Sequence, residues 1–207
     1  MIKLLRKLVV YLLPYSSAYR KFVKSKLQAS YIDFLKFKLG LSKEHWPVHK
    51  TCTIANYNKI FVGINALVGR PGSYIQGAGE VYFGKYVRLA PNVGILSSNH
   101  DIYNQQIRHH KTIIIGDYSW IGMNSVVLAG VVLGTRTVVA AGSVVTKSFP
   151  EGFCVIGGVP AKIIKKLDKD KFVPWKEEEE YYGFIPKDEF EKKNKEIIKK
   201  MNIKIGL

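Results

Sequence analysis

The chain has 207 residues, which bounds it at one domain, or one domain with appendages. Hydrophobic residues make up 47% of it and charged residues 23%, a globular composition that excludes collagen-like, low-complexity and fully disordered proteins. The 32 Lys and Arg residues against 16 Asp and Glu give a formal net charge of +16. This excess indicates an anionic partner, which is nucleic acid, a membrane surface or a charged substrate.

Residues 1–46 are predicted to form a basic, amphipathic helical segment. Residues 1–50 hold 11 basic and 2 acidic residues, a net charge of +9. The longest apolar run, Leu8 to Leu13, is far shorter than the roughly 20 residues of a spanning helix. Two interpretations stay open: helices that pack on the domain, or contact with an anionic membrane through residues 1–27.

The two cysteines, Cys52 and Cys154, are far apart and have no metal-ligand spacing. We therefore expect no metal, and a reducing cytoplasm as the location. The sequence contains no motif for a phosphate-binding loop or a metalloprotease. No recognition motif supports nucleic acid as the partner of the basic chain.

A repeat of six residues runs through the middle of the chain. Six consecutive blocks begin with an aliphatic residue, at Ile115, Ile121, Val127, Leu133, Val139 and Val145. Gly or Ala follows in four blocks, and an earlier run from Phe83 to Ile95 keeps the same step. This period predicts a coil with three short flat faces per turn, whose aliphatic residues point to the axis. We expect the small residue to let the backbone bend at each corner.

Further motifs accompany the repeat: LAPNVGI at 89–95, SNHD at 98–101, WIGMN at 120–124, GSVVTK at 142–147 and GVPAK at 158–162. With them, residues 47–167 resemble the hexapeptide-repeat acyltransferases. The branch includes galactoside, maltose and serine acetyltransferases and O-acetyltransferases of capsule and exopolysaccharide synthesis. The resemblance implies an all-β core, a left-handed parallel β-helix, with flanking N- and C-terminal α-helices. Residues 168–207 are expected to form a charged helical tail.

The repeat is interrupted before Ile115, because 20 residues separate it from Ile95 and 20 is not a multiple of six. We therefore expect a loop excursion at about residues 101–112, where function is commonly placed on a rigid solenoid. Acetyl transfer needs a base with a pKa near neutrality, and histidine has one. The family's catalytic base matches His100, at the start of this excursion.

A carboxylate is expected to orient the ring of His100. Asp101 is the adjacent candidate and Glu80 is the other. Two more histidines, His109 and His110, lie within the excursion. They stay open as second bases, acceptor-binding groups or part of a solvated basic loop.

The resemblance implies acetyl-CoA as the donor, bound in a groove between coils of adjacent subunits. Such a shared groove implies a homotrimer. Ala141 matches the residue whose backbone amide approaches the thioester, where an N–H group can stabilise an oxyanion. The other predicted donor-binding residues are Trp120, Gly142, Thr146, Lys147, Lys162 and Lys165.

Polar side chains in the coils before the excursion and at its start are predicted to bind a sugar acceptor: Tyr74, Gln76, Asn92, Ser98 and Asn99. We therefore predict a cytoplasmic, acetyl-CoA-dependent O-acetyltransferase that acts on a surface polysaccharide or its precursor. The inner face of the cell membrane is a further expected location. The alternatives are an N-acetyltransferase of a nucleotide-linked amino sugar, a serine-type or xenobiotic acetyltransferase, and a non-catalytic scaffold.

Overall fold

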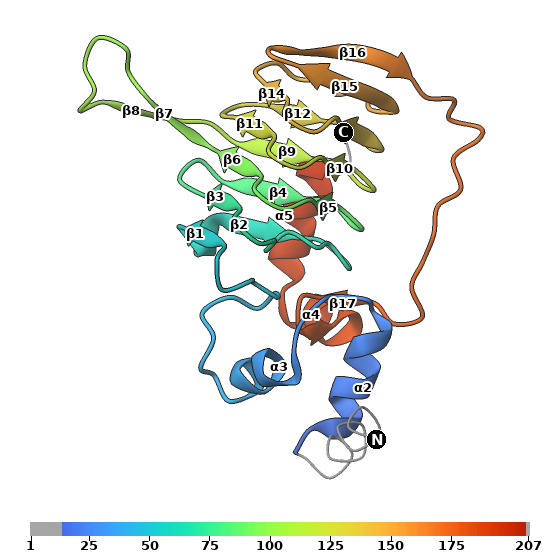
Figure 1. The fold of residues 1–207 in the computed structure, drawn as a ribbon. Helices are drawn as coiled ribbons and strands as arrows, with labels where there is room; N and C mark the ends of the chain where they lie inside the picture. The colour runs from blue at the N-terminus through green and yellow to red at the C-terminus, as the bar shows by residue number, and fades with distance from the viewer. Residues whose placement is uncertain (1–13, 206–207) are drawn as a thin grey trace, which may run out of the picture.

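The computed structural model describes residues 14–205, and three mainly parallel sheets form the sides of a coil (Figure 1). The first sheet contains β1 (Thr53–Ala55), β3 (Tyr74–Gln76), β6 (Gly94–Leu96), β11 (Val126–Leu128) and β14 (Val144–Val145). The second contains β2 (Ile60–Val62), β4 (Val81–Phe83), β9 (Ile113–Ile115) and β12 (Val132–Leu133), and a 3-10 turn, Tyr57–Lys59, precedes it. The third contains β5 (Arg88–Leu89), β10 (Trp120–Ile121), β13 (Thr137–Val139), β15 (Cys154–Gly158) and the antiparallel β16 (Ala161–Lys166).

The register confirms the period of six. Leu133 pairs with Ile115, and Val139 pairs with Ile121, a step of 18 positions in each case (133 − 115 and 139 − 121). One turn of the coil therefore takes three blocks, one for each sheet. The left hand that the resemblance implies stays a prediction.

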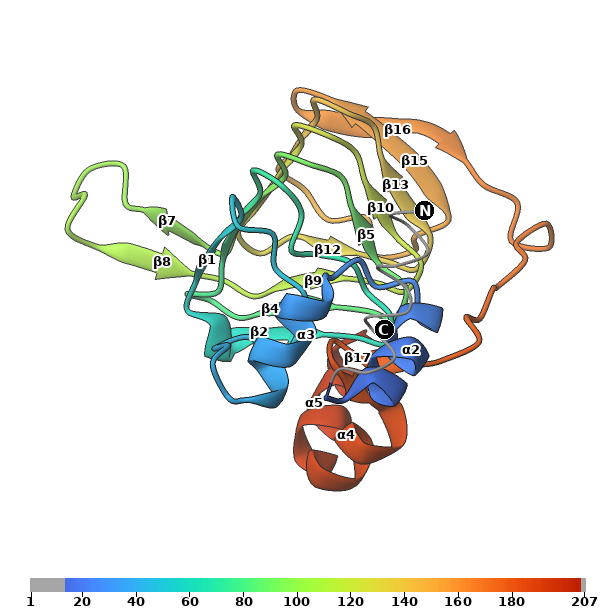
Figure 2. The ribbon, with the colours of Figure 1, turned by 60° about the horizontal axis from the view of Figure 1, so that its bottom comes forward.

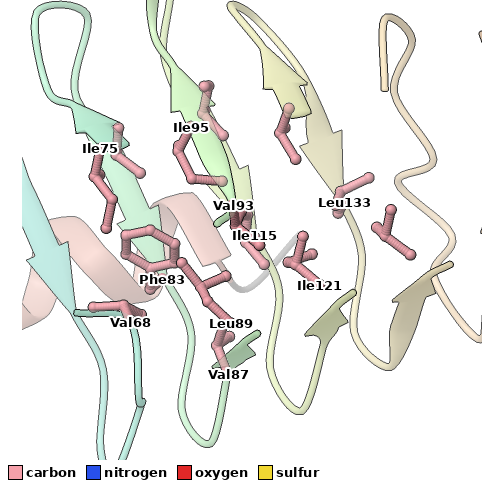
Figure 3. Close-up of a cluster of buried hydrophobic side chains, with 14 of the residues drawn as sticks. Val68, Ile75, Phe83, Val87, Leu89, Val93, Ile95, Ile115, Ile121 and Leu133 are labelled. Atoms are coloured by element: carbon pink, nitrogen blue, oxygen red, sulfur yellow. The ribbon is translucent and has the colours of Figure 1, made fainter. Parts of the chain in front are cut away.

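The aliphatic residues form one continuous column along the axis (Figure 3). In the first sheet, Ile95 lies between Ile75 and Val127, and all three are fully buried. Full burial of one such side chain stabilises the fold by about 1.5–3 kcal/mol. A single turn of the coil cannot bury its own face, so the stack of turns is the unit that folds.

The small residue of each block is expected to let the backbone bend at the corner, and this explanation is wrong. The bend lies at the fourth position of the block, where φ is positive at Tyr118, Asn124, Gly130, Arg136 and Gly142. The glycines of the second position are needed because stacked corners approach closely. A Cβ at Gly134 would lie 2.1 Å from the Pro150 carbonyl oxygen, and one at Gly116 would lie 2.6 Å from the Gly134 carbonyl carbon.

Buried hydroxyl groups connect successive turns at the fifth position of the block. Ser125 is fully buried, and its Oγ donates to the Ala140 carbonyl at 2.9 Å and accepts from the Ser143 N–H at 3.3 Å. Ser119, Thr137 and Ser143 occupy equivalent buried positions. A buried polar group without a partner is costly, and these hydroxyls supply partners where strands end.

Two helices, α2 (Ser16–Lys24) and α3 (Tyr31–Lys38), lie at the base of the coil (Figure 1). Phe22 and Leu27 are buried in a cluster with Phe34, Tyr181 and Phe184. For residues 14–27 the structure therefore supports the packing interpretation, because their apolar side chains contact protein. Residues 1–13, also part of the expected membrane contact, lie outside the described residues. From 14 to 205, no helix is long and apolar enough to cross a membrane.

The C-terminal tail returns along the coil to its base (Figure 2). It ends in β17 (Tyr181–Tyr182), β18 (Ile185–Pro186), α4 (Lys187–Lys193) and α5 (Lys195–Ile205). On the way, the ring of Trp175 contacts that of Tyr118, with centroids 4.8 Å apart. Met201 of α5 packs on Tyr82 and Ile114 of the second sheet. The expected C-terminal helices are thus present: α5 packs on the second sheet, and α4 lies at the base of the coil (Figure 1).

Candidate active site

A hairpin of β7 (Ser98–His100) and β8 (Arg108–His110) leaves the coil between the first and second sheets (Figures 1 and 2). Its base is closed by a hydrogen bond of 2.9 Å from the Lys111 N–H to the Ser97 carbonyl. The sequence predicted an excursion from about residue 101. Since the hairpin starts at Ser98, His100 lies within it rather than at the end of the coil.

His100 is exposed, and its ring is held by one backbone group. The Nδ1 atom lies 2.6 Å from the carbonyl oxygen of Gln105. A carbonyl only accepts hydrogen bonds, so Nδ1 carries the proton and Nε2 presents its lone pair. Among the described residues, none bonds to Nε2. The ring therefore leaves Nε2 accessible, an orientation that is compatible with general-base chemistry.

Asp101 bonds to His109 and not to His100. Its Oδ1 accepts from the N–H groups of Asn104 and Tyr103 at 2.9 Å each, and its Oδ2 lies 3.1 Å from His109 Nε2. The hydrogen bond from the Asn104 N–H, followed by those from His109 and Tyr103, lowers the pKa of Asp101 to about 2. The orienting role expected of Asp101 is filled here by the Gln105 carbonyl.

The other carboxylate candidate, Glu80, is engaged elsewhere. Its Oε1 lies 2.6 Å from the Nζ of Lys200 on α5, and its Oε2 accepts from the Tyr82 hydroxyl at 3.0 Å. Sequence reasoning missed Gln105, because a backbone carbonyl leaves no residue signature. The only signal was the length of the excursion, which allows the chain to fold back on His100.

The predicted acceptor residues lie at two corners of the coil, some where the strands of the first sheet begin and others where these strands end. Gln76 ends β3, and its buried Oε1 has no hydrogen-bond partner among the described residues. Ser98 and Asn99 lie beside His100 on β7, so these three residues are on the hairpin side. Tyr74 begins β3 and Asn92 precedes β6, so both lie toward the corner where the strands of the first sheet begin, away from the hairpin. The structure thus brings three of the five candidates toward His100.

The predicted donor residues lie in three places on one chain. Thr146 and Lys147 follow β14, at the corner of the coil from which the hairpin leaves. Ala141 and Gly142 lie at the corner between the third and first sheets. There Gly142 has a φ of +70° with open space around its Cβ position. Within residues 14–205, no group accepts a hydrogen bond from the Ala141 N–H.

The third place is the exposed side of the third sheet. Trp120 on β10 is 53% exposed, and Lys162 and Lys165 on β16 are exposed. The strand of Trp120 pairs with β5 and β13, whereas the hairpin of His100 continues from β6 of the first sheet. A single chain therefore does not bring these residues to His100.

In the part of the chain that is described, side chains are not arranged for metal binding or for thiol chemistry. There, no three His, Cys, Asp or Glu side chains gather into a metal-binding group. Cys52 and Cys154 are free thiols, and burial raises the pKa of Cys52 to about 11. A thiol with so high a pKa is a poor nucleophile at neutral pH, because the thiolate is the reactive form.

Residues 112–147 match the bacterial transferase hexapeptide family, with six repeats. The galactoside O-acetyltransferase of Escherichia coli K12 is 34% identical over 102 residues, 47% of this chain and 50% of that protein. A protein of the same strain, provisionally named a lipopolysaccharide biosynthesis O-acetyl transferase, is 34% identical over 110 residues, 47% of this chain and 56% of its own length. This chain spans about half the length of the curated relatives it matches.

A solved structure shows the same fold over most of its length. It is a hexapeptide-repeat acetyltransferase of Vibrio cholerae in complex with acetyl-CoA. The TM-score is 0.59 at 26% sequence identity, and the match covers 74% of this chain and 87% of that one.

Proposed function

We propose that this chain is a hexapeptide-repeat acetyltransferase that transfers an acetyl group from acetyl-CoA to a sugar hydroxyl group. The match of residues 112–147 to the hexapeptide family and the similarity to a galactoside O-acetyltransferase support this proposal. The observation that carries this proposal is the state of His100. Its Nδ1 is fixed by the Gln105 carbonyl, and its Nε2 is open at the side of a hexapeptide coil. That arrangement supports general-base chemistry on an acceptor brought from outside.

The proposed reaction is a direct transfer. The acceptor O–H gives its proton to Nε2 of His100 as its oxygen bonds to the thioester carbonyl carbon. The carbonyl oxygen then carries negative charge, which the Ala141 N–H is positioned to stabilise if it faces the thioester. When the C–S bond breaks, the imidazolium returns the proton to the sulfur, and CoA leaves as the thiol. The histidine ends the cycle as it began.

The donor site is proposed to join two chains. In one chain, the exposed side of the third sheet, with Trp120, Lys162 and Lys165, lies away from the hairpin. A second copy that placed this side against the hairpin would complete a groove, with the lysines toward the CoA phosphates. We therefore propose a homotrimer, in which His100 comes from one subunit and these donor residues, together with Ala141, from its neighbour.

The acceptor is proposed to be a sugar unit of a surface polysaccharide or its precursor. Gln76, Ser98 and Asn99 offer amide and hydroxyl groups beside His100, which suit sugar hydroxyls. The similarity to a protein named for lipopolysaccharide biosynthesis supports this class of acceptor. Asn92 and Tyr74, toward the other edge of the sheet, would serve the acceptor only through a neighbouring subunit.

Release of CoA from acetyl-CoA, measured with a thiol reagent, tests the reaction. The panel of acceptors should contain neutral sugars, oligosaccharides and a nucleotide-linked amino sugar, and mass spectrometry should locate the acetyl group. We expect turnover on a hydroxyl-bearing sugar, and about 10²–10⁴-fold less with His100→Ala. Turnover only on the amino sugar would instead assign N-acetyl transfer, and no turnover on any acceptor would favour a scaffold.

Mixing of two inactive variants tests the shared site. His100→Ala removes the base, and Ala141→Trp fills the proposed donor groove at an exposed position. Co-refolded or co-expressed mixtures should regain part of the activity. Some interfaces then join the intact His100 of one variant to the intact donor groove of the other. Sedimentation should give a trimer. If the mixture stays inactive and the protein sediments as a monomer, the shared groove is rejected.

A further inference from the structure

The outer face of α3 exposes large aliphatic side chains at helical spacing. Ile32, Lys36 and Leu39 follow one another at intervals of four and three residues, so they share one face. Ile32 is 62% exposed and Leu39 is 56% exposed. Leu41, 72% exposed, and Lys43, also exposed, follow directly after the helix in the chain. We refer to these five residues as the α3 surface.

The opposite face of α3 fixes this orientation. Phe34 is 1% exposed and packs against the rings of Phe22 and Phe184, with centroids 5.3 and 6.1 Å away. Ser30 and Asp33 form a capping box that sets the start of the helix. Because the face of the helix that carries Phe34 is packed against these rings, the helix cannot turn Ile32 and Leu39 toward the protein interior. Single exposed apolar residues are ordinary, but a group of three alternating with lysines indicates a contact surface.

The surroundings of the α3 surface are strongly basic. Residues 14–50 hold eight Lys and Arg and two acidic residues, a net charge of +6. Two of these lysines are neutralised from the C-terminal tail, since Lys24 pairs with Glu178 and Lys26 pairs with Glu177. Lys36 and Lys43 form no ion pair with any described residue. The aliphatic side chains are therefore accompanied by two lysines without ion pairs, in a segment whose two acidic residues are Asp33 and Glu44.

The start of the described chain lies beside the same helix. The Tyr31 hydroxyl donates a hydrogen bond to the Pro14 carbonyl. The 13 residues that precede Pro14, MIKLLRKLVVYLL, likewise combine basic with aliphatic residues. The helices lie at the base of the coil, while the hairpin with His100 projects from its side (Figure 1). A partner at the base would leave the hairpin accessible.

We propose that the α3 surface docks on an anionic lipid bilayer. The side chains of Ile32, Leu39 and Leu41 enter the boundary between headgroups and acyl chains, while Lys36 and Lys43 contact lipid phosphates. This role is independent of the proposed acetyl transfer. It differs from the expected membrane contact through residues 1–27, because the apolar side chains of Phe22 and Leu27 are buried in protein.

Co-sedimentation of the full chain with vesicles tests the proposal. Phosphatidylcholine vesicles with and without phosphatidylglycerol separate anionic from neutral surfaces. We expect binding to the anionic vesicles that weakens as salt is raised, because exposed charges are screened. The charge variant Lys36→Glu with Lys43→Glu should bind at least tenfold more weakly, since one lysine near such a surface contributes roughly fivefold.

The aliphatic part of the surface has a matched control. Ile32→Ser with Leu41→Ser should also weaken binding at least tenfold. Val173→Ser with Ile203→Ser removes two equally exposed aliphatic side chains, 79% and 65% exposed, from the C-terminal tail and should bind normally. Circular dichroism and acetyl transfer to a soluble acceptor report whether the variants remain folded.

Three results would overturn the proposal. The first is no retention of the wild-type protein by anionic vesicles at low salt. The second is binding of the α3 variants as strong as that of the wild type, which would place any contact in residues 1–13. The third is an equal loss of binding by the control. If the double aliphatic variant is unfolded, Leu41→Ser alone decides, because it lies outside the helix. Loss of vesicle binding with full transfer activity separates this proposal from the proposed function.

Discussion

The coil and the hairpin that carries His100 are built on different principles. In the coil, every strand except β16 has a parallel neighbour from another turn, and the axial side chains are buried. In the hairpin, β7 and β8 pair only with each other, and all three residues of β8 are exposed. The coil is therefore held by contacts distant in sequence and the hairpin by local hydrogen bonds. A rigid support thus presents a small element whose side chains are not needed for the core.

This difference separates stability from activity in space. Substitutions in the stacked corners should change the free energy of unfolding and leave the base intact. Substitutions in the hairpin should change transfer and leave global stability nearly unchanged. The predictions below test that separation, beginning with the largest effect.

The largest expected effect is on the hairpin. His100→Ala should lower kcat/KM by about 10²–10⁴-fold, the usual contribution of a positioned general base. Because the side chain is exposed, the free energy of unfolding should change by less than about 0.5 kcal/mol. Steady-state kinetics and urea unfolding measure the two quantities on one preparation. A large loss of stability in this variant would break the separation between hairpin and coil.

The next effect is on a corner of the coil. Gly134→Ala should destabilise the fold by about 1–3 kcal/mol, because its Cβ would lie 2.1 Å from the Pro150 carbonyl oxygen. Urea unfolding at fixed protein concentration measures the change. Gly94→Ala is the matched control, since its Cβ would make ordinary contact with Val126 at 3.5 Å. Equal stability of the two variants would contradict the close approach of stacked corners.

A smaller effect is expected at a buried hydroxyl group. Ser125→Ala leaves the Ser143 N–H without its side-chain partner, whereas the Ala140 carbonyl keeps its hydrogen bond from the Ser143 hydroxyl. An unsatisfied buried group costs about 1–3 kcal/mol, and water entering the space would reduce that cost. Ser17→Ala on exposed α2 is the control. Thermal unfolding should show a lower Tm for Ser125→Ala alone, with the kcat of the remaining folded enzyme unchanged.

The sequence predicted the coil because its signal repeats. An aliphatic residue at every sixth position from Ile115 to Val145 has one economical explanation, and all of these residues are buried. The same periodicity did not reveal why Gly134 is small, because the carbonyl that excludes a side chain belongs to another turn of the coil. Contacts between different turns of the coil cannot be predicted from a local stretch of sequence.

The site was predictable only in part, for a related reason. His100 was found through a motif, but its hydrogen-bond partner is the backbone of Gln105, which any residue would offer. Asp101 is one of the two predicted partners, with Glu80, because it is adjacent to His100 in sequence. Neighbouring side chains on an extended strand point to opposite sides, and the carboxylate instead meets His109 across the hairpin. Asn92 was grouped with the acceptor residues by order in the chain and lies toward the other edge of the sheet.

The smallest expected effect concerns the pH dependence of the hairpin. The ordinary pKa of an Asp carboxyl is 3.8, and the N–H groups of Asn104 and Tyr103, with His109, lower that of Asp101 to about 2. The pKa is depressed in the folded state. The ionised carboxylate therefore contributes its full stabilisation above about pH 4, and the contribution is lost as pH falls toward 2. Since the group is exposed, the change should be confined to the hairpin.

NMR spectroscopy can observe this local titration directly. The Asp101 carboxyl signal should titrate near pH 2, and Asp101→Asn should accelerate amide hydrogen exchange at Tyr103 and Asn104 at neutral pH. Exchange at the buried Val127 of the coil should be the same in both proteins, since its stability comes from other turns. A midpoint near 4 would show that the turn does not hold the carboxylate in solution. Faster exchange at Val127 would show that hairpin and coil unfold as one unit, which is the opposite of what their construction implies.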